Sequence, residues 1–226
     1  MTAGPEPPGD SAGRRRAVVV AGHAGQETAA RAAMVDPSPD VRGSALNALA
    51  RMGSLRAEDI STALSDPAGE VRRRACEIAG RLGGTASLPG QLVLALADTS
   101  PSVVEAACYA LGELGAGEHP GVVSALSSVA RGHGDPLFRE AAVAALGALG
   151  QADGLVAVLA ALDDKAAVRR RAVIALAGFN DAFEGDEVQA ALQRALSDPD
   201  WQVRQGAEDV LGQRARPNGP GPARPA

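Results

Sequence analysis

Apolar residues recur along this chain with a helical period, in a frame that repeats every 30 to 35 residues. In one clear copy, Val71, Ala75, Ile78 and Leu82 occupy positions one, five, eight and twelve of the frame. At 100° per residue, these side chains fall within about 60° of one another and form the apolar stripe of an amphipathic helix. Six copies are visible, and their position-one residues are Val41, Val71, Val103, Phe138, Val168 and Val203.

Shorter apolar segments lie between these helices, around Ile60, Leu92, Leu126, Leu159 and Leu192. We expect each segment to form a first helix that packs antiparallel on the second helix that follows it. Residues 15–22 align with residues 170–178 and predict a degenerate half-repeat that caps the N-terminal end. The pattern therefore predicts an all-α protein of about six helical hairpins plus one capping half-repeat.

The ends of the second helices carry their own signals. Asp-Pro precedes the helix in four copies, which favours an aspartate N-cap followed by proline in the first turn. Position thirteen holds residues that readily adopt the left-handed conformation ending a helix, namely Gly53, Gly83, Gly115, Gly150 and Asn180. Position ten is always small, which predicts close approach of neighbouring second helices. Its residues are Ala50, Gly80, Gly112, Gly147, Ala177 and Gly212.

Composition narrows the function classes. Aromatic residues make up only 2% of the chain, which contains three histidines and two cysteines. Cys76 and Cys108 share an apolar frame position, so we expect buried thiols rather than a disulfide or a metal site. Residues 17–212 contain 16 basic and 25 acidic side chains, a net charge of −9 and the wrong sign for a general nucleic-acid binder. Arginines at 72–74 or 169–171 could still contact phosphate locally.

The recurring Asp, Val-Arg, Ala, Leu and Gly positions resemble HEAT-like repeats, specifically the short subtype first described in phycobilisome lyases. The resemblance covers residues 14–212, and we expect residues 1–13 and 213–226, rich in Pro, Gly and Ala, to be disordered tails. It implies a right-handed α-solenoid whose second helices line a concave face.

The resemblance also implies a ladder of ion pairs between neighbouring repeats. Arginine stands at position two in most copies, with an aspartate six residues earlier, and the third copy breaks the series with Val104. We expect these side chains to be structural, and to pair across the repeat boundary rather than within one turn. The predicted ladder residues are Asp36, Arg42, Asp66, Arg72, Asp163, Arg169, Asp198 and Arg204, and Arg139 occupies the same position in the fourth copy.

Positions three, seven and eleven of the second helices project onto the inner face. Two interpretations stay open there: an ordinary solvated surface, or a groove that binds a basic or amphipathic protein segment. The only tyrosine of the chain lies on this face among several carboxylates. The candidate partner-binding residues are Arg73, Glu77, Glu105, Tyr109, Glu113, Glu140 and Arg170.

An enzymatic role finds little support in the sequence. HEAT-like iron hydroxylases use His-Glu dyads as metal ligands, and no histidine of this chain precedes a glutamate. The sequence therefore predicts a non-catalytic scaffold or adaptor without cofactor or metal, which binds a protein or peptide. The alternative left open is a bilin-lyase-like or other cofactor-handling accessory factor.

Targeting signals are weak. Residues 14–16 followed by a short apolar run resemble the start of an export signal, but polar residues follow at once. The longest apolar region, residues 141–162, is interrupted by Gly150–Gly154, which predicts a helical hairpin rather than a membrane span. We expect a cytoplasmic protein, and the oligomeric state stays open.

Overall fold

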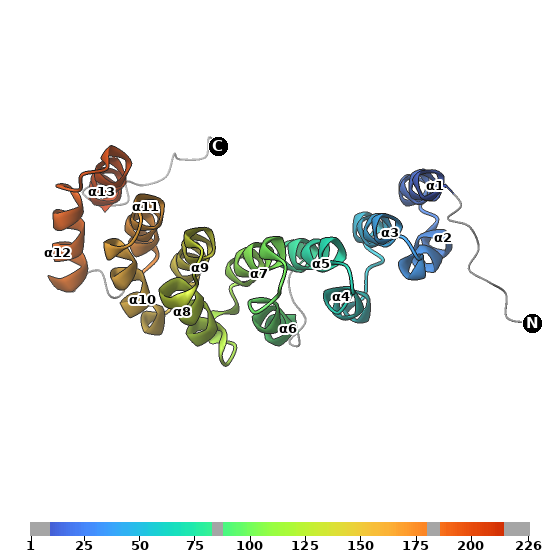
Figure 1. Ribbon diagram of the computed structural model, residues 1–226, viewed down its shortest axis with the longest axis horizontal. Coiled ribbons are helices and arrows are strands. Elements are labelled where there is room, and N and C mark those ends of the chain that lie inside the picture. The colour runs from blue at the N-terminus through green and yellow to red at the C-terminus, as the bar shows by residue number, and fades with distance from the viewer. Residues whose placement is uncertain (1–9, 83–87, 180–185, 215–226) are drawn as a thin grey trace, which may run out of the picture. The chain divides into compact units, whose positions relative to one another are not determined.

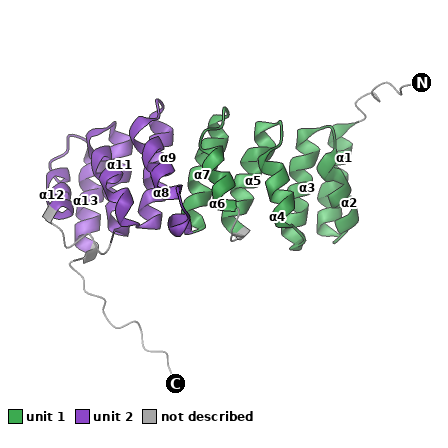
Figure 2. Ribbon diagram, turned by 90° about the horizontal axis from the view of Figure 1, so that it is seen from below, with its two compact units in different colours: residues 1–114 green, residues 115–226 purple. Residues whose placement is uncertain are grey.

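The computed structural model describes residues 10–82, 88–179 and 186–214. These residues form α-helices and short 3₁₀ turns, with no strand among them. The chain divides into two compact units, residues 1–114 and 115–226, which are described separately (Figure 2). The predicted all-α fold of repeated helical hairpins is confirmed within these ranges.

Unit 1 begins with a lone helix and continues with three hairpins. Its α-helices are α1 (Ser11–His23), α2 (Glu27–Ala32), α3 (Pro39–Met52), α4 (Ala57–Leu64), α5 (Gly69–Leu82), α6 (Leu88–Ala95) and α7 (Pro101–Glu113), with a 3₁₀ turn η1 (Ala33–Val35) after α2. The second helices α3, α5 and α7 pack side by side, and α1 extends their layer (Figure 1). The N-terminal segment thus caps the repeats as the sequence predicted.

Unit 2 repeats the same arrangement. Its α-helices are α8 (Val122–Gly132), α9 (Pro136–Leu149), α10 (Leu155–Ala160), α11 (Ala166–Ala175), α12 (Asp186–Ala195) and α13 (Trp201–Arg214). Short 3₁₀ turns lie at η2 (Ala116–Glu118), η3 (Ala152–Gly154), η4 (Ala161–Asp163) and η5 (Leu176–Gly178). Here α9, α11 and α13 form the layer of second helices, and α8, α10 and α12 are their hairpin partners (Figure 1).

The core of each unit lies between its two layers of helices. Position five of the frame is always an alanine with no exposed surface, for example Ala45 in α3 and Ala142 in α9. Positions one and eight are buried in all six copies, so the predicted stripe is the packed face of each second helix. The stripe of α5 packs against Ala63 of α4, and the stripe of α3 packs against Ala30 of α2.

The role predicted for Asp-Pro is wrong in three of its four copies. Helix α3 begins at Pro39, and the carboxylate of Asp36 instead accepts a hydrogen bond from the Ser38 N–H in the preceding turn, at 2.8 Å. Only Asp135 acts as a true N-cap, because its carboxylate accepts from the Leu137 N–H and Pro136 begins α9. An aspartate three residues before the first helical residue keeps its second oxygen accessible to side chains of the preceding repeat.

Glycines at two frame positions serve the backbone. Gly53, Gly115 and Gly150 at position thirteen have φ between 58° and 67°, which is the left-handed conformation that ends a helix. Gly83 and Asn180, predicted to do the same, lie outside the described residues. At position ten, a Cβ on Gly147 would lie 2.6 Å from Cβ of Ala175, so α9 and α11 pack too closely for a larger residue.

Both cysteines are free and buried in the helix layer of unit 1. Burial raises the pKa of the Cys76 and Cys108 thiols to about 12, because the thiolate is poorly solvated there. They pack as small apolar residues, as the sequence predicted.

Among the described residues, α1 begins at Ser11 and α13 ends at Arg214, close to the predicted solenoid boundaries of residues 14 and 212. The greater part of each predicted tail lies outside the described residues. Trp201, at the start of α13, is 64% exposed. Among the helices that the structure describes, none is both long and apolar enough to cross a membrane.

Candidate ligand-binding face

Four second helices, α3, α5, α9 and α11, carry an arginine at position two that reaches the next repeat. Arg42 of α3 donates from Nε and Nη2 to the two carboxylate oxygens of Asp66, both at 2.7 Å, while its Nη1 donates to the backbone oxygen of Asp36 at 2.8 Å. Arg72 repeats this pattern with Asp98, at 2.6 and 2.8 Å. Each guanidinium therefore joins its own turn to the turn of the following repeat, in the bidentate geometry that suits arginine.

The ladder continues in unit 2 with one correction. Arg139 pairs with Asp164 at 2.6 Å, whereas the sequence had assigned the aspartate of that copy to Asp163. Asp163 ends the 3₁₀ turn η4 and is exposed, so the following residue is the one that faces α9. Arg169 then donates to both oxygens of Asp198, at 2.8 Å each.

Two ends of the ladder differ from its interior. Arg14 of α1 occupies position two of the capping half-repeat and pairs with Asp36 at 2.8 Å, which the sequence analysis did not anticipate. Arg204, in the last repeat, donates to the backbone oxygens of Asp198 and Pro199 at 2.7 and 3.1 Å. The ladder residues thus hold turns together rather than form a site.

The ion pairs of the ladder change the pKa of their aspartate carboxyl groups. Hydrogen bonds from the paired arginines lower the pKa of Asp36, Asp98, Asp164 and Asp198 below the ordinary value for aspartate. Burial acts in the opposite direction but is outweighed at all four carboxyl groups. Since both partners stay charged at neutral pH, the ladder contributes at physiological conditions.

The predicted face is solvent-exposed on α7 of unit 1. Tyr109 is 56% exposed, and Glu105 and Glu113 lie one helical turn before and after it, also exposed. On the neighbouring helix α5, Arg73 and Glu77 form a half-buried ion pair with each other. The α7 section of the face therefore offers one aromatic ring between two carboxylates that have no ion-pair partner among the described residues.

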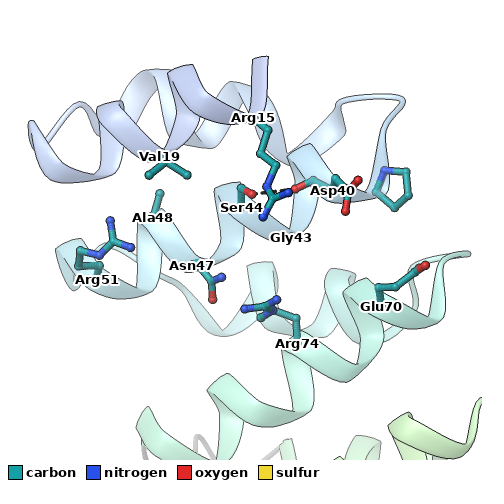
Figure 3. A pocket seen from close by; sticks show the side chains of 11 residues that line it. Arg15, Val19, Asp40, Gly43, Ser44, Asn47, Ala48, Arg51, Glu70 and Arg74 are labelled. Atoms are coloured by element: carbon teal, nitrogen blue, oxygen red, sulfur yellow. Dashed lines mark hydrogen bonds between the residues drawn. The ribbon is translucent and has the colours of Figure 1, made fainter. Parts of the chain in front are cut away.

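A groove crosses α1, α3 and α5 on the same positions of the frame (Figure 3). Position three of α1 is Arg15, position seven of α3 is Asn47, and position eleven of α3 is Arg51; all three line the groove. Arg74 at position four of α5 points into it from the opposite side (Figure 3). Asp40 and Glu70 line the side of the groove where α3 and α5 begin (Figure 3).

A second hollow continues this groove between the two helices α3 and α5. It shares Asn47 and Arg51 with the first and adds Ile78 and Arg81. The side chains of Arg15, Arg51 and Arg81 make no hydrogen bond or ion pair with any described residue. We call Arg15, Arg51, Arg74 and Arg81, together with Asn47, the arginine groove.

The predicted inner face did not include this groove, although its residues occupy recognisable positions of the repeat frame. Positions three, seven and eleven were assigned from α5 onward, while the same positions of α1 and α3 already contained Arg15, Asn47 and Arg51. Position four lies outside the predicted face, and Arg74 at this position borders the groove only because α3 packs beside α5. That neighbour is a property of the packing.

In unit 2 the predicted face residues interact with one another. The carboxylate of Glu140 on α9 accepts a hydrogen bond from Nη2 of Arg171 at 3.3 Å, and Nη2 of Arg170 lies 3.9 Å away. The Nε atoms of Arg170 and Arg171 are buried without a hydrogen-bond partner among the described residues. Glu140 and Arg170 therefore belong to a local cluster of charges.

Helical hairpins that pack side by side, joined by a repeated arginine–aspartate pair, define a helical-repeat protein of the α-solenoid class. Residues 57–147, 91–177 and 152–221 match the family model of HEAT repeats, and together these matches cover more than half of the chain. The chain belongs to the HEAT-repeat family. No curated protein matches the sequence significantly.

Solved structures show the same fold at low sequence identity. The Escherichia coli protein YibA is 17% identical, with a TM-score of 0.61 over 94% of this chain and 78% of its own. An engineered protein is 19% identical, with a TM-score of 0.57 over 83% of this chain and 95% of its own. A designed armadillo repeat protein, solved in complex with the peptide (KR)4, is 18% identical, with a TM-score of 0.54 over 88% and 97% of the two chains.

Proposed function

We propose that this protein is a scaffold that binds a basic or amphipathic peptide segment of a partner protein on the α7 section of unit 1. The observation that carries the proposal is the exposed ring of Tyr109 between the exposed carboxylates of Glu105 and Glu113. A tyrosine offers a large apolar surface at low conformational cost, and it is enriched among residues that dominate binding.

The charges of α7 favour a basic ligand. Glu105 and Glu113 project from the same helix face as Tyr109, so lysine or arginine side chains on either side of an apolar contact would meet carboxylates. The designed armadillo repeat protein with a similar fold was solved with the peptide (KR)4, which supports a basic peptide as a ligand class for such a surface.

The proposal uses only part of the predicted face. Arg73 and Glu77 neutralise each other on α5, and Glu140 already accepts a hydrogen bond from Arg171 in unit 2. We therefore assign contact with the ligand to Glu105, Tyr109 and Glu113, and a supporting role to the Arg73–Glu77 pair. The scaffold is proposed to act without catalysis, and the phycobilisome-lyase subtype remains a prediction from the repeat pattern.

A binding measurement with a defined probe tests this function. Fluorescein-labelled (KR)4 is titrated with the full chain, and fluorescence anisotropy is recorded at low and high salt. We expect saturable binding that weakens as salt screens the carboxylates. The double variant Tyr109→Ala/Glu105→Arg should bind at least tenfold more weakly, because it removes the ring and reverses one charge.

A matched control separates this effect from a general change of charge. Leu94→Ala/Glu58→Arg changes an exposed apolar residue on α6 and an exposed glutamate on α4, away from the second helices. It should bind (KR)4 like the parent, and circular dichroism should show all three proteins folded. Equal loss in both double variants, or no binding by the parent, would contradict the proposed function.

A further inference from the structure

The arginine groove has a charge opposite to that of α7. From α1 to α7, position three reads Arg15, Gly43, Arg73 and Glu105, and position eleven reads Arg51, Arg81 and Glu113 in α3, α5 and α7. The charge of the side chains at these positions therefore changes from positive to negative within unit 1, on one face of the repeats. A single type of ligand charge cannot suit both sections.

The cations of the groove are available for a ligand. Arg42 and Arg72, on the same two helices, each place two guanidinium nitrogens on a carboxylate within 2.8 Å. Arg51 and Arg81 have no such partner among the described residues, and the nearest carboxylate of Arg74 is Glu77 at 3.9 Å. Each of these guanidinium groups can therefore donate two parallel hydrogen bonds to an incoming carboxylate.

The groove is also shaped for an extended chain. It runs across α1, α3 and α5, and with helices about 8–10 Å apart this path is about 16–20 Å long, enough for about five or six extended residues. Asn47 lies at its centre and has both a donor and an acceptor, as a peptide backbone requires.

The two carboxylates in the groove orient the ligand. Asp40 and Glu70 occupy only the side of the groove where α3 and α5 begin, whereas Arg51 and Arg81 lie on the other side, in the last turns of their helices. Ligand carboxylates would be repelled on the first side and attracted on the second, where the helix dipoles add negative potential that the full charges of the arginines outweigh. The acidic side chains of a ligand should therefore meet Arg51 and Arg81.

We infer that the arginine groove is a second peptide-binding site of unit 1, which takes an acidic segment rich in aspartate or glutamate. The site stands beside the proposed α7 site and uses the same face of the repeat, but different helices and the opposite charge. A partner with an acidic segment could occupy the groove whether or not a basic segment occupies α7.

A nucleic acid is the competing anionic ligand, and the charges disfavour it. A strand of phosphates needs a continuous positive surface, whereas Asp40 and Glu70 interrupt this groove and residues 17–212 carry a net charge of −9. A peptide can place neutral residues beside Asp40 and Glu70 and keep its carboxylates on the other side of the groove. The peptide is therefore the occupant that the groove favours.

Titration with an acidic probe tests the inference. Fluorescein-labelled (ED)4 is measured by anisotropy against the full chain, the variant Arg51→Glu/Arg81→Glu, and a control Arg56→Glu/Arg194→Glu with the same change of charge outside the groove. We expect the groove variant to bind at least tenfold more weakly and the control to bind within twofold to threefold of the parent. Both variants should keep the circular dichroism spectrum of the parent.

Two further probes distinguish the possible failures. The groove variant should still bind (KR)4, so loss of (ED)4 alone supports the acidic site independently of the proposed function at α7. Equal weakening of (ED)4 by the control variant, or no (ED)4 binding by the parent, would overturn the inference. Tighter binding of a ten-nucleotide oligothymidine than of (ED)4, lost in the groove variant, would also overturn it, in favour of nucleic acid.

Discussion

Arg72 and Arg74 lie two residues apart on α5 and have different environments. The side chain of Arg72 is 16% exposed and bonded to Asp98 through two nitrogens, whereas that of Arg74 is 35% exposed and 3.9 Å from Glu77. Position two points to the next repeat, and position four points to the groove. The comparison shows that the place in the repeat frame, and not the residue type, decides whether an arginine holds the fold together or faces a ligand.

Removing one guanidinium from each place gives the largest expected contrast. Arg72→Met loses two bonds to Asp98 and those to the backbone oxygens of Asp66 and Pro67, and it leaves a half-buried carboxylate without its partner. We expect a loss of about 2–4 kcal/mol in the free energy of unfolding, measured by urea denaturation. Arg74→Met should change it by less than about 0.5 kcal/mol. Similar losses for the two variants would break the comparison.

Replacing glycine by alanine should lower the free energy of unfolding at position ten, where helices touch, and raise it at position three, on the open face. Gly147→Ala at position ten places a Cβ 2.6 Å from Cβ and 2.7 Å from Cα of Ala175, so α9 and α11 must separate. We expect a loss of about 1–3 kcal/mol, since overpacking outweighs the better helix propensity of alanine. Gly43→Ala at position three has no atom within 4 Å of the new Cβ and should stabilise by about 0.5–1 kcal/mol. Thermal and urea unfolding measure both changes.

The smallest expected effect is the contribution of one ladder pair to the pH dependence of stability. The hydrogen bonds from Arg72 hold the pKa of Asp98 below its value in the unfolded chain, about 3.9. The folded state therefore binds fewer protons, and the stability from this group is present above that value and is lost as pH falls through the folded pKa.

Urea midpoints recorded from pH 7 to pH 3 test this sign. In the parent, the urea concentration at the midpoint should decrease as the pH is lowered below about 5. In Arg72→Met the decrease should be less steep, because Asp98 has lost the partner that lowers its pKa. Arg74→Met serves as the control and should follow the parent. A steeper acid loss in Arg72→Met would contradict the assignment of the ladder.

Much of the fold could be predicted from the sequence because its signals are local. The stripe of positions one, five and eight, the glycine at position thirteen and the small residue at position ten each depend on the backbone of one helix or on a neighbour of the same kind. In a repeat protein, each unit meets a copy of itself, so a local pattern repeated six times also predicts the contacts between units of the pattern.

The exact partners of the charges could not be predicted in this way. Arg139 meets a carboxylate 25 residues ahead and Arg169 one 29 residues ahead, because the intervening loops differ in length and path. The turn η4 exposes Asp163 and brings Asp164 to Arg139. Likewise, Asp36 before Pro37 suits a helix N-cap by sequence rules. In the structure it lies two residues before the actual N-cap, Ser38, and its carboxylate pairs with Arg14 instead.

The sequence by itself determined the repeat, the helices and the residues available at each position of the frame. The tertiary structure decided which of the available arginines are paired and which stay open, because that depends on the distance to a carboxylate on another helix. Arg72 and Arg74 are both arginines on one amphipathic helix, and only the packing of α5 between α3 and α7 gives one of them Asp98 and the other a groove.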